Sequence, residues 1–186
     1  MVKGAIRRFS DPESYAAAFG DARLKLTITG AGDFWARLTR LRSQHLEMYR
    51  CRESLPRITY ISLPTERVVL SFPIGSASPL FGGAALRNGD VMLHSHGDRM
   101  HQRSNGACQW GLVSLSAKQL AECSEALNGQ PIVWPPENRV LRPTRSEALR
   151  FRHSLAHSQR AARGQDAGVT SPPELQCFDP CAGGIP

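Results

Sequence analysis

The amino-acid sequence predicts a mainly β fold with flanking helices, in which an antiparallel β-barrel or sandwich is followed by two helices. Apolar residues recur at every second position in several short segments, as they do in strands with one buried face. Clusters of turn-forming residues separate these segments. Sustained helical spacing of apolar residues begins only near residue 116, after the last strand-like segment.

The first expected element is a short helix over residues 11–19. Ser10-Asp11-Pro12-Glu13 combines a capping-box pattern with a proline in the first turn, and Gly20 ends the helix. Strands are expected next, where the apolar period changes to two. The alternating positions are Leu24, Leu26 and Ile28, then Ala36 and Leu38, and then Val68, Leu70, Phe72 and Ile74.

Turn signals lie at GAGD, ESLPR, LPTER and RNGD, and Asn88-Gly89 in the last of these is a strong hairpin signal. The segment WGLVSL from Trp110 is one more strand. A helix follows in SAKQLAECSEALNG, with Gly129 as its C-cap. These signals divide the chain into a β domain over residues 1–140 and a C-terminal part.

A second helix is expected over about residues 146–163, with an apolar stripe formed by Ala148, Phe151, Leu155 and Ala162. The stripe needs a partner, either the β domain or a second copy of the chain, so Phe151 and Leu155 are candidate dimerisation residues. Residues 164–186 are rich in Gly and Pro without a period, and we expect this tail to be disordered.

Charge and composition limit the function classes. The net charge is +7, and the tail from residue 164 has three acidic and no basic residues, which leaves 23 basic against 13 acidic residues, or +10, in the rest. This basicity supports only weak, salt-sensitive attraction to nucleic acid. No apolar run approaches the ~20 residues of a membrane span, and the first residues lack a signal peptide, so we expect a cytoplasmic protein without a membrane partner.

The five cysteines are an odd number without regular spacing. Cys51, Cys108 and Cys123 lie singly in expected strands or a helix, where a buried free thiol is common. Cys177 and Cys181 form a CxxxC pair in the tail, which is half of what zinc sites usually need.

The stretch GDVMLHSHGDRMHQRSN holds three histidines, His94, His96 and His101. His94-Ser95-His96 matches the HxH half of the first cupin metal motif, but Met100 or His101 stands where that motif has a glutamate. Gly89, Gly97, His101 and Asn105 register better with the second cupin motif, which brings only one ligand. Upstream, His45, Glu47 and Glu53 do not complete the ligand set, so no metal cofactor is expected.

Three interpretations of the histidines stay open. They can bind a metal in a metal-dependent cupin enzyme, hydrogen-bond or face solvent at the mouth of a barrel, or contact a ligand without metal.

The order of the parts resembles the N-terminal regulatory domain of AraC-family transcriptional regulators, over about residues 9–160. The most specific pieces are ESLPRI at 53–58, RVVLSFPIG at 67–75 and WGLVSL at 110–115. The resemblance implies a cupin-like sensor domain over residues 1–140 and a linker or dimerisation helix over 141–163. It also implies that DNA is read by a separate C-terminal domain with two helix-turn-helix units.

The hypothesis is therefore a non-enzymatic effector-binding and dimerisation domain of an AraC-type regulator, in a truncated or stand-alone form that binds no specific DNA sequence by itself. It would form homodimers, or heterodimers with full-length regulators, and bind a small apolar or amphipathic effector. Candidate ligand-binding residues are Trp35, Phe72, His101 and Trp110, and the alternative for the aromatic ones is ordinary core. The rivals are the metal-dependent enzyme and non-specific DNA binding through the arginine-rich final helix.

Overall fold

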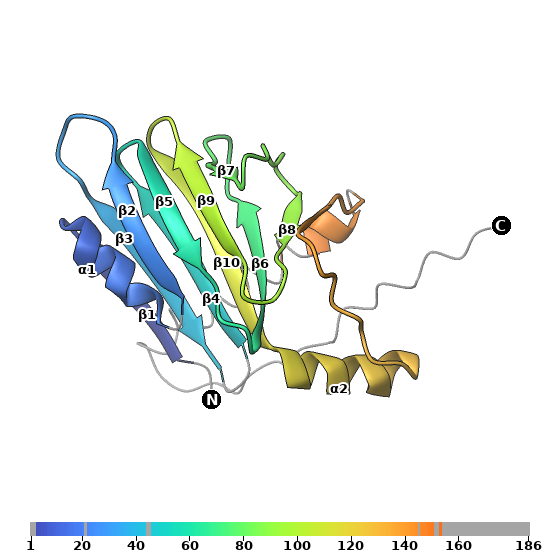
Figure 1. Ribbon diagram of the computed structural model, residues 1–186. Helices are drawn as coiled ribbons and strands as arrows, with labels where there is room; N and C mark the ends of the chain where they lie inside the picture. Colours follow the sequence, from blue (N-terminus) through green and yellow to red (C-terminus); the bar gives the residue numbers. More distant parts are fainter. Residues whose placement is uncertain (1–2, 21, 44–45, 145, 151–152, 154–186) are drawn as a thin grey trace.

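The computed structural model describes residues 3–20, 22–43, 46–144, 146–150 and 153. They form a sandwich of a seven-stranded and a four-stranded antiparallel sheet with few short helices, which confirms the predicted fold class (Figure 1). Among the described residues, no helix is long and apolar enough to cross a membrane.

The large sheet has the strand order β1-β3-β4-β10-β6-β8-β11. Its strands are β1 (Lys3–Phe9), β3 (Ala36–Arg42), β4 (Leu46–Glu53), β10 (Cys108–Ser116), β6 (Arg67–Pro73), β8 (Val91–Leu93) and β11 (Arg139–Leu141). The small sheet has the order β2-β5-β9-β7. Its strands are β2 (Arg23–Ile28), β5 (Arg57–Ser62), β9 (Arg99–Ser104) and β7 (Leu80–Phe81).

The turns expected at GAGD, ESLPR and LPTER each carry the chain from one sheet to the other. RNGD is also a tight turn, in which the Asp90 amide donates to the Arg87 carbonyl at 3.0 Å. However, β7 before it and β8 after it belong to different sheets, so the hairpin prediction is wrong. A turn signal fixes the local backbone and leaves open which strand will pair with the next.

Both helices of the described core match the prediction. The first is α1 (Pro12–Ala16), continued by the 3-10 helix η1 (Ala17–Phe19), and Gly20 ends it with a φ of 63°. Its N-cap is Asp11 rather than Ser10, because the Asp11 carboxylate accepts from the Ser14 amide at 2.7 Å. The second is α2 (Ala117–Asn128), which Gly129 ends in the left-handed conformation.

The final predicted helix is described only in part. Residues 146–150 and 153 are helical. Phe151 and Leu155 lie outside the described residues, as do the tail and its Cys177 and Cys181. Cys51 and Cys108 are buried free thiols, as expected, and burial raises the pKa of Cys108 to about 12.

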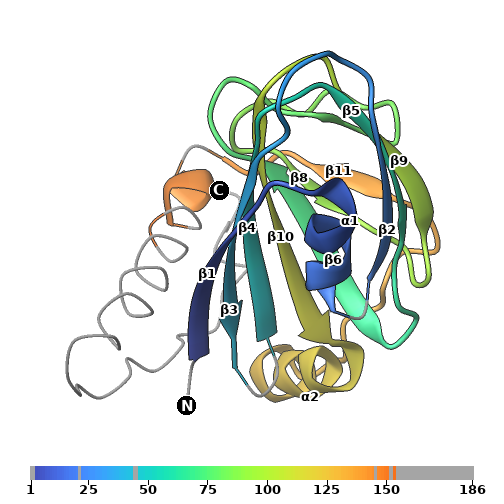
Figure 2. The same cartoon turned by 90° about the vertical axis from the view of Figure 1, so that its left-hand side faces the viewer.

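The main core lies between the sheets, and α1 sits in the gap between them (Figure 2). From α1 and η1, Tyr15 and Phe19 insert fully into this core. The Phe19 ring stacks in parallel on Trp110 of β10 at a centroid distance of 5.8 Å, and on Tyr49 of β4 at 5.4 Å. These aromatic contacts fix the N-terminal helix to the inner face of the large sheet.

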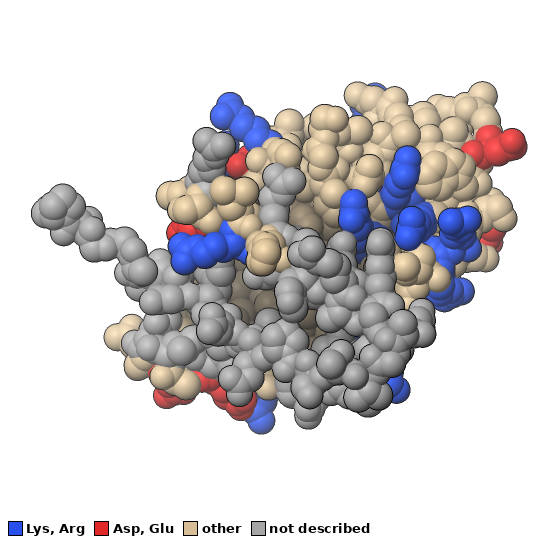
Figure 3. Space-filling view, turned by 180° about the vertical axis from the view of Figure 1, so that it is seen from behind, with Lys and Arg blue, Asp and Glu red and all other residues tan. Residues whose placement is uncertain are grey.

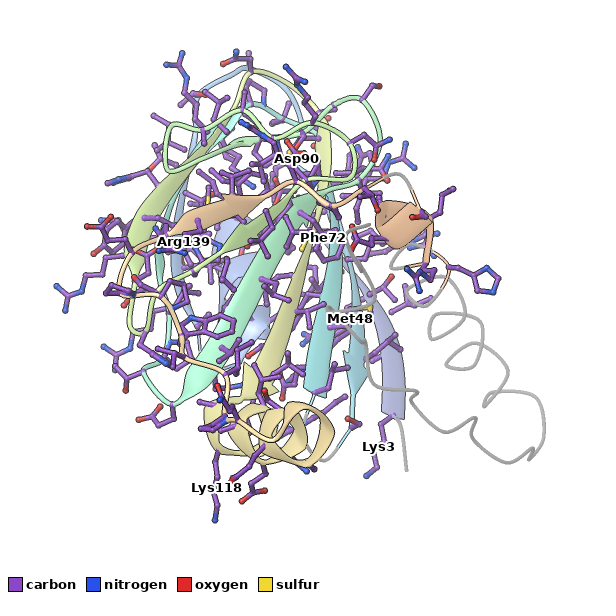
Figure 4. All side chains as sticks on the ribbon, turned by 90° about the vertical axis from the view of Figure 1, so that its right-hand side faces the viewer. Lys3, Met48, Phe72, Asp90, Lys118 and Arg139 are labelled. Carbon is purple, nitrogen blue, oxygen red and sulfur yellow. The ribbon has the colours of Figure 1, made fainter. Side chains whose placement is uncertain are left out.

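A second apolar cluster occupies the outer face of the large sheet, on the side away from β2, β5 and β9. It is formed by the buried residues Leu41, Met48, Phe72, Val91 and Val113 (Figure 4). Phe72 packs so closely over Gly111 of β10 that a Cβ atom at Gly111 would overlap its ring. Both faces of the large sheet are therefore apolar at this level.

A buried ion pair joins the two sheets. Glu53 is the last residue of β4 and Arg57 the first of β5, and the Arg57 Nε donates to the Glu53 Oε2 at 2.7 Å. Glu53 also accepts from the Tyr15 hydroxyl at 2.7 Å, from the Trp110 Nε1 at 3.0 Å and from the Cys108 thiol at 3.2 Å. The Arg57 Nη2 donates to Gln102 of β9 at 2.9 Å, so the network links two strands of the small sheet, two strands of the large sheet and α1.

The surroundings of Glu53 determine its ionisation. Burial by itself raises the pKa of this carboxyl, but the charge and hydrogen bond of Arg57, with hydrogen bonds from Trp110 and Tyr15, outweigh burial and leave the pKa below its usual value. A carboxyl whose pKa is lower in the folded state stabilises the fold above its unfolded-state pKa, and this contribution is lost as the pH falls through the folded-state pKa.

We expect Glu53→Gln to destabilise the protein at pH 7 by about 3–5 kcal/mol, because it leaves the buried Arg57 charge without its partner. Urea unfolding from pH 7 to pH 3 checks this, and the variant should lose less stability on acidification than the wild type. Glu137→Gln, which removes an exposed carboxylate from the segment before β11, is the control. Equal pH dependence of the wild type and Glu53→Gln would contradict the assignment.

We expect Gly111→Ala to destabilise the fold by about 1–3 kcal/mol, since the added methyl group overpacks against Phe72. Thermal or urea unfolding measures the effect. In combination with Phe72→Ala, which removes the overlapping ring, the cost of Gly111→Ala should largely disappear in a double-mutant cycle. Additive costs of the two changes would show that the two residues do not constrain each other.

Candidate functional site

A cavity lies between the sheets at the end of the sandwich where β10 runs into α2. Its empty volume is about 310 Å³, a figure that counts the open solvent at its mouth, and its enclosed part has room for only about one water molecule. Most of its lining is apolar. The lining residues are Phe19, Ala22, Glu47, Tyr49, Leu63, Pro64, Val69, Leu112 and Ser114.

The polar groups of the lining come from alternate residues of two neighbouring strands. Glu47 and Tyr49 point inward from β4, and Ser114 is the inward partner of Glu47 on β10. The Tyr49 hydroxyl lies 2.5 Å from the Glu47 Oε2 and 3.3 Å from the Phe19 carbonyl oxygen. The strand period of two therefore places all three polar groups in one row facing the same space.

Arginines surround this row. Arg40 and Arg42 of β3 each approach Glu47 at 3.0 Å, and the Arg67 Nε donates to the Ser114 hydroxyl at 2.6 Å. Burial raises the pKa of Glu47, but the hydrogen bonds from Tyr49 and Arg40 and the arginine charges outweigh it, so the pKa lies below its usual value and Glu47 is ionised at neutral pH.

A ligand that widened this cavity would meet Phe19, Val69 and Leu112 with its apolar part, and the row of Glu47, Tyr49 and Ser114 with a polar group. Each of these three polar side chains is already held by a neighbour, which gives the row a fixed geometry for recognition.

The structure does not bring the four predicted ligand-binding residues together. Trp110 is buried in the core and does not line the cavity itself. Its ring stacks on Phe19, which does line it. Trp35 is 44% exposed, with the Arg52 guanidinium 5.3 Å from its ring. His101 is exposed on β9, against the Tyr60 ring at 5.2 Å.

The expectation that Trp35 and Phe72 face an interior cavity is wrong. In β6 the inward residues are Val69 and Ser71, which places Phe72 in the outer apolar cluster. The more apolar face of β6, with Leu70 and Phe72, points outward into the second cluster, while Ser71 points inward, so the alternation indicated the wrong side. Trp35 precedes β3, whose first residue, Ala36, is the inward one.

The three histidines also separate. His94 is fully buried, with its Nε2 2.9 Å from the Ser71 hydroxyl and its Nδ1 3.2 Å from the Asp98 carboxylate. His96 is exposed near the Trp134 ring at 6.2 Å, and His101 points outward from β9 because Met100 and Gln102 are the inward residues.

The ligand set that the alternative metal-enzyme interpretation needs is therefore not assembled by His94, His96 and His101. Both ring nitrogens of His94 have protein partners, and within the described part of the chain no three His, Cys, Asp or Glu side chains lie close enough to hold a metal ion. Of the interpretations left open by the sequence, hydrogen bonding within the protein applies to His94, and exposure to solvent applies to His96 and His101.

Sequence reasoning missed most of the cavity. Glu47 was considered only as an upstream metal ligand, and Tyr49 and Ser114 were not singled out. The sequence did contain a hint of the cavity, because Glu47, Tyr49, Cys51 and Glu53 occupy alternate positions of one strand and therefore share one face. Whether that face points into the sandwich cannot be decided until the partner strands are known.

No protein-family model and no curated protein sequence matches this chain. Among solved structures, the chain is similar to the crystal structure of the AraC-like transcriptional activator CuxR. The similarity has a TM-score of 0.52 and covers 94% of this chain and 73% of the other, with 15% sequence identity. At this identity the likeness concerns the fold, so the chain shares its fold with an AraC-like transcriptional activator.

Proposed function

We propose that this chain is a non-enzymatic regulatory domain of the AraC type, which binds a small apolar or amphipathic effector and forms dimers. The observation that carries the proposal is the cavity between the sheets, with its apolar lining and its fixed row of Glu47, Tyr49 and Ser114. The structural similarity to an AraC-like transcriptional activator supports a regulatory rather than an enzymatic role.

The position of the cavity explains how an effector would act. Leu112 and Ser114 line it from β10, and the same strand continues through Ser116 into α2. An effector pressed against these residues would alter the junction between the sandwich and α2. The proposal therefore places the sensor in the sandwich and the response in the helices that follow it.

A larger side chain at a residue that lines the cavity should occupy its space. Ala22 lines it and is half-buried, so Ala22→Trp should place an indole in the space where the effector binds. Compounds from a panel of small apolar and amphipathic molecules that raise the melting temperature of the wild type should no longer do so in the variant. At a concentration of one hundred times Kd, the stabilisation that disappears is about 2.7 kcal/mol.

Ala107→Trp is the matched control, because it adds the same side chain in the exposed turn before β10, at the opposite end of the sandwich from the cavity, and should keep the response to the compounds. Calorimetric titration of wild type and both variants then gives Kd values. A compound that binds the wild type and Ala22→Trp equally well would place the effector site elsewhere.

Dimerisation is proposed through the apolar stripe of the final helix. The wild type should have twice the chain mass of 20.4 kDa in size-exclusion chromatography with light scattering. Phe151→Glu and Leu155→Glu should each give monomers, because a carboxylate in an apolar helix interface is costly to bury. His153→Glu places the same group on the exposed face and should remain dimeric. A monomeric wild type at high concentration would overturn this part.

A further inference from the structure

Three arginines stand side by side on the outer face of the large sheet. Arg8 of β1 pairs with Arg37 of β3, and Arg37 pairs with Arg52 of β4. The adjacent register row, formed by Phe9, Ala36 and Glu53, is buried between the sheets, so the three arginines point the opposite way. We call Arg8, Arg37 and Arg52 the arginine row.

Nothing in the described part of the chain neutralises the arginine row. The ion pairs found among the described residues involve Arg40, Arg42, Arg57, His94 and Lys118. Like charges directly opposite each other on neighbouring strands destabilise a sheet. Without a counterion among the described residues, the arginine row is available to an external anion.

The arginine row is also partly preorganised. Arg52 lies over the Trp35 ring at 5.3 Å, which holds its guanidinium at the surface. Arg37 is half-buried, and its Nε is a buried donor without a hydrogen-bond partner in the described structure. Figure 3, which shows the molecule from behind, has blue side chains gathered on the side of β1, β3 and β4.

The spacing of the arginine row fits a polyanion. Neighbouring strands lie about 4.8 Å apart, so the row extends over about 10 Å along a flat surface. A duplex carries one negative charge per about 1.7 Å of its axis, and a guanidinium binds phosphate oxygens in a bidentate manner. Because the row spans about 10 Å, successive phosphates of one backbone can engage all three side chains.

We propose that the arginine row binds the phosphate backbone of double-stranded DNA without sequence preference. This goes beyond effector binding and dimerisation, and it uses the face of the large sheet opposite the buried Glu53. Backbone contacts of this kind position a protein on a duplex and carry no base information. The contact would hold the domain against the DNA while sequence is read by other means.

The test is fluorescence anisotropy with a random-sequence duplex over a range of salt concentrations. The triple variant Arg8→Gln, Arg37→Gln and Arg52→Gln should lose at least about tenfold in affinity at low salt. The slope of log K against log salt should fall by about 2.7 in magnitude, because each lost phosphate contact contributes about 0.9. Circular dichroism and thermal melting confirm that the variant is folded.

The control is the triple variant Arg23→Gln, Arg99→Gln and Arg103→Gln, which removes the same charge from exposed positions on the outer face of the small sheet. It should keep most of the slope. If the two triple variants lose affinity equally, the attraction is general charge and the proposal fails. It also fails if the row variant keeps wild-type binding, or if it loses only binding to polyglutamate.

Should the triple variant not fold, Arg8→Gln with Arg52→Gln carries the same prediction, since both side chains are exposed. The slope should then fall by about 1.8, and Arg99→Gln with Arg103→Gln is the matched control. An unchanged slope in the row double variant overturns the proposal.

Discussion

The structure depends on the ion pair between Glu53 and Arg57, which ties the two sheets together from inside. Removing two charges from water is costly, and the pair is stable because almost every oxygen and nitrogen it presents finds a partner. Tyr15 brings the N-terminal helix to Glu53, and Gln102 brings β9 to Arg57. One buried pair thus fixes the relative position of both layers and of α1.

The position of the Glu53–Arg57 pair also bears on where the cavity and the arginine row lie. At the level of Glu53 the interior is filled by the polar network and by Trp110, and the cavity lies toward the other end, around Tyr49. On the opposite side of the same sheet, the residues next to Phe9, Ala36 and Glu53 are the arginine row. Strand alternation therefore gives one sheet a buried anion on one face and, on the other, three cations without an ion pair among the described residues.

Sequence reasoning predicted the fold class, the two helices with their glycine ends, and the strand segments, because each depends on local periodicity and capping. It also singled out ESLPRI, which contains both members of the central pair. It could not predict the Asn88-Gly89 connection correctly, the direction of Phe72 or the separation of the histidines. These depend on which strands pair across the sheets, and the alternation of β6, whose more apolar face points outward, does not give that information.

The central claim is that the cavity, and no other part of the sandwich, receives a small effector. The most direct measurement is a methyl NMR titration of the full chain with a compound that stabilises it. The account predicts that the methyl resonances of Leu63, Val69 and Leu112 shift together with one Kd, while those of Leu41 and Val113 in the outer cluster stay in place. Shifts confined to the outer cluster, with the cavity methyls unchanged, would contradict it.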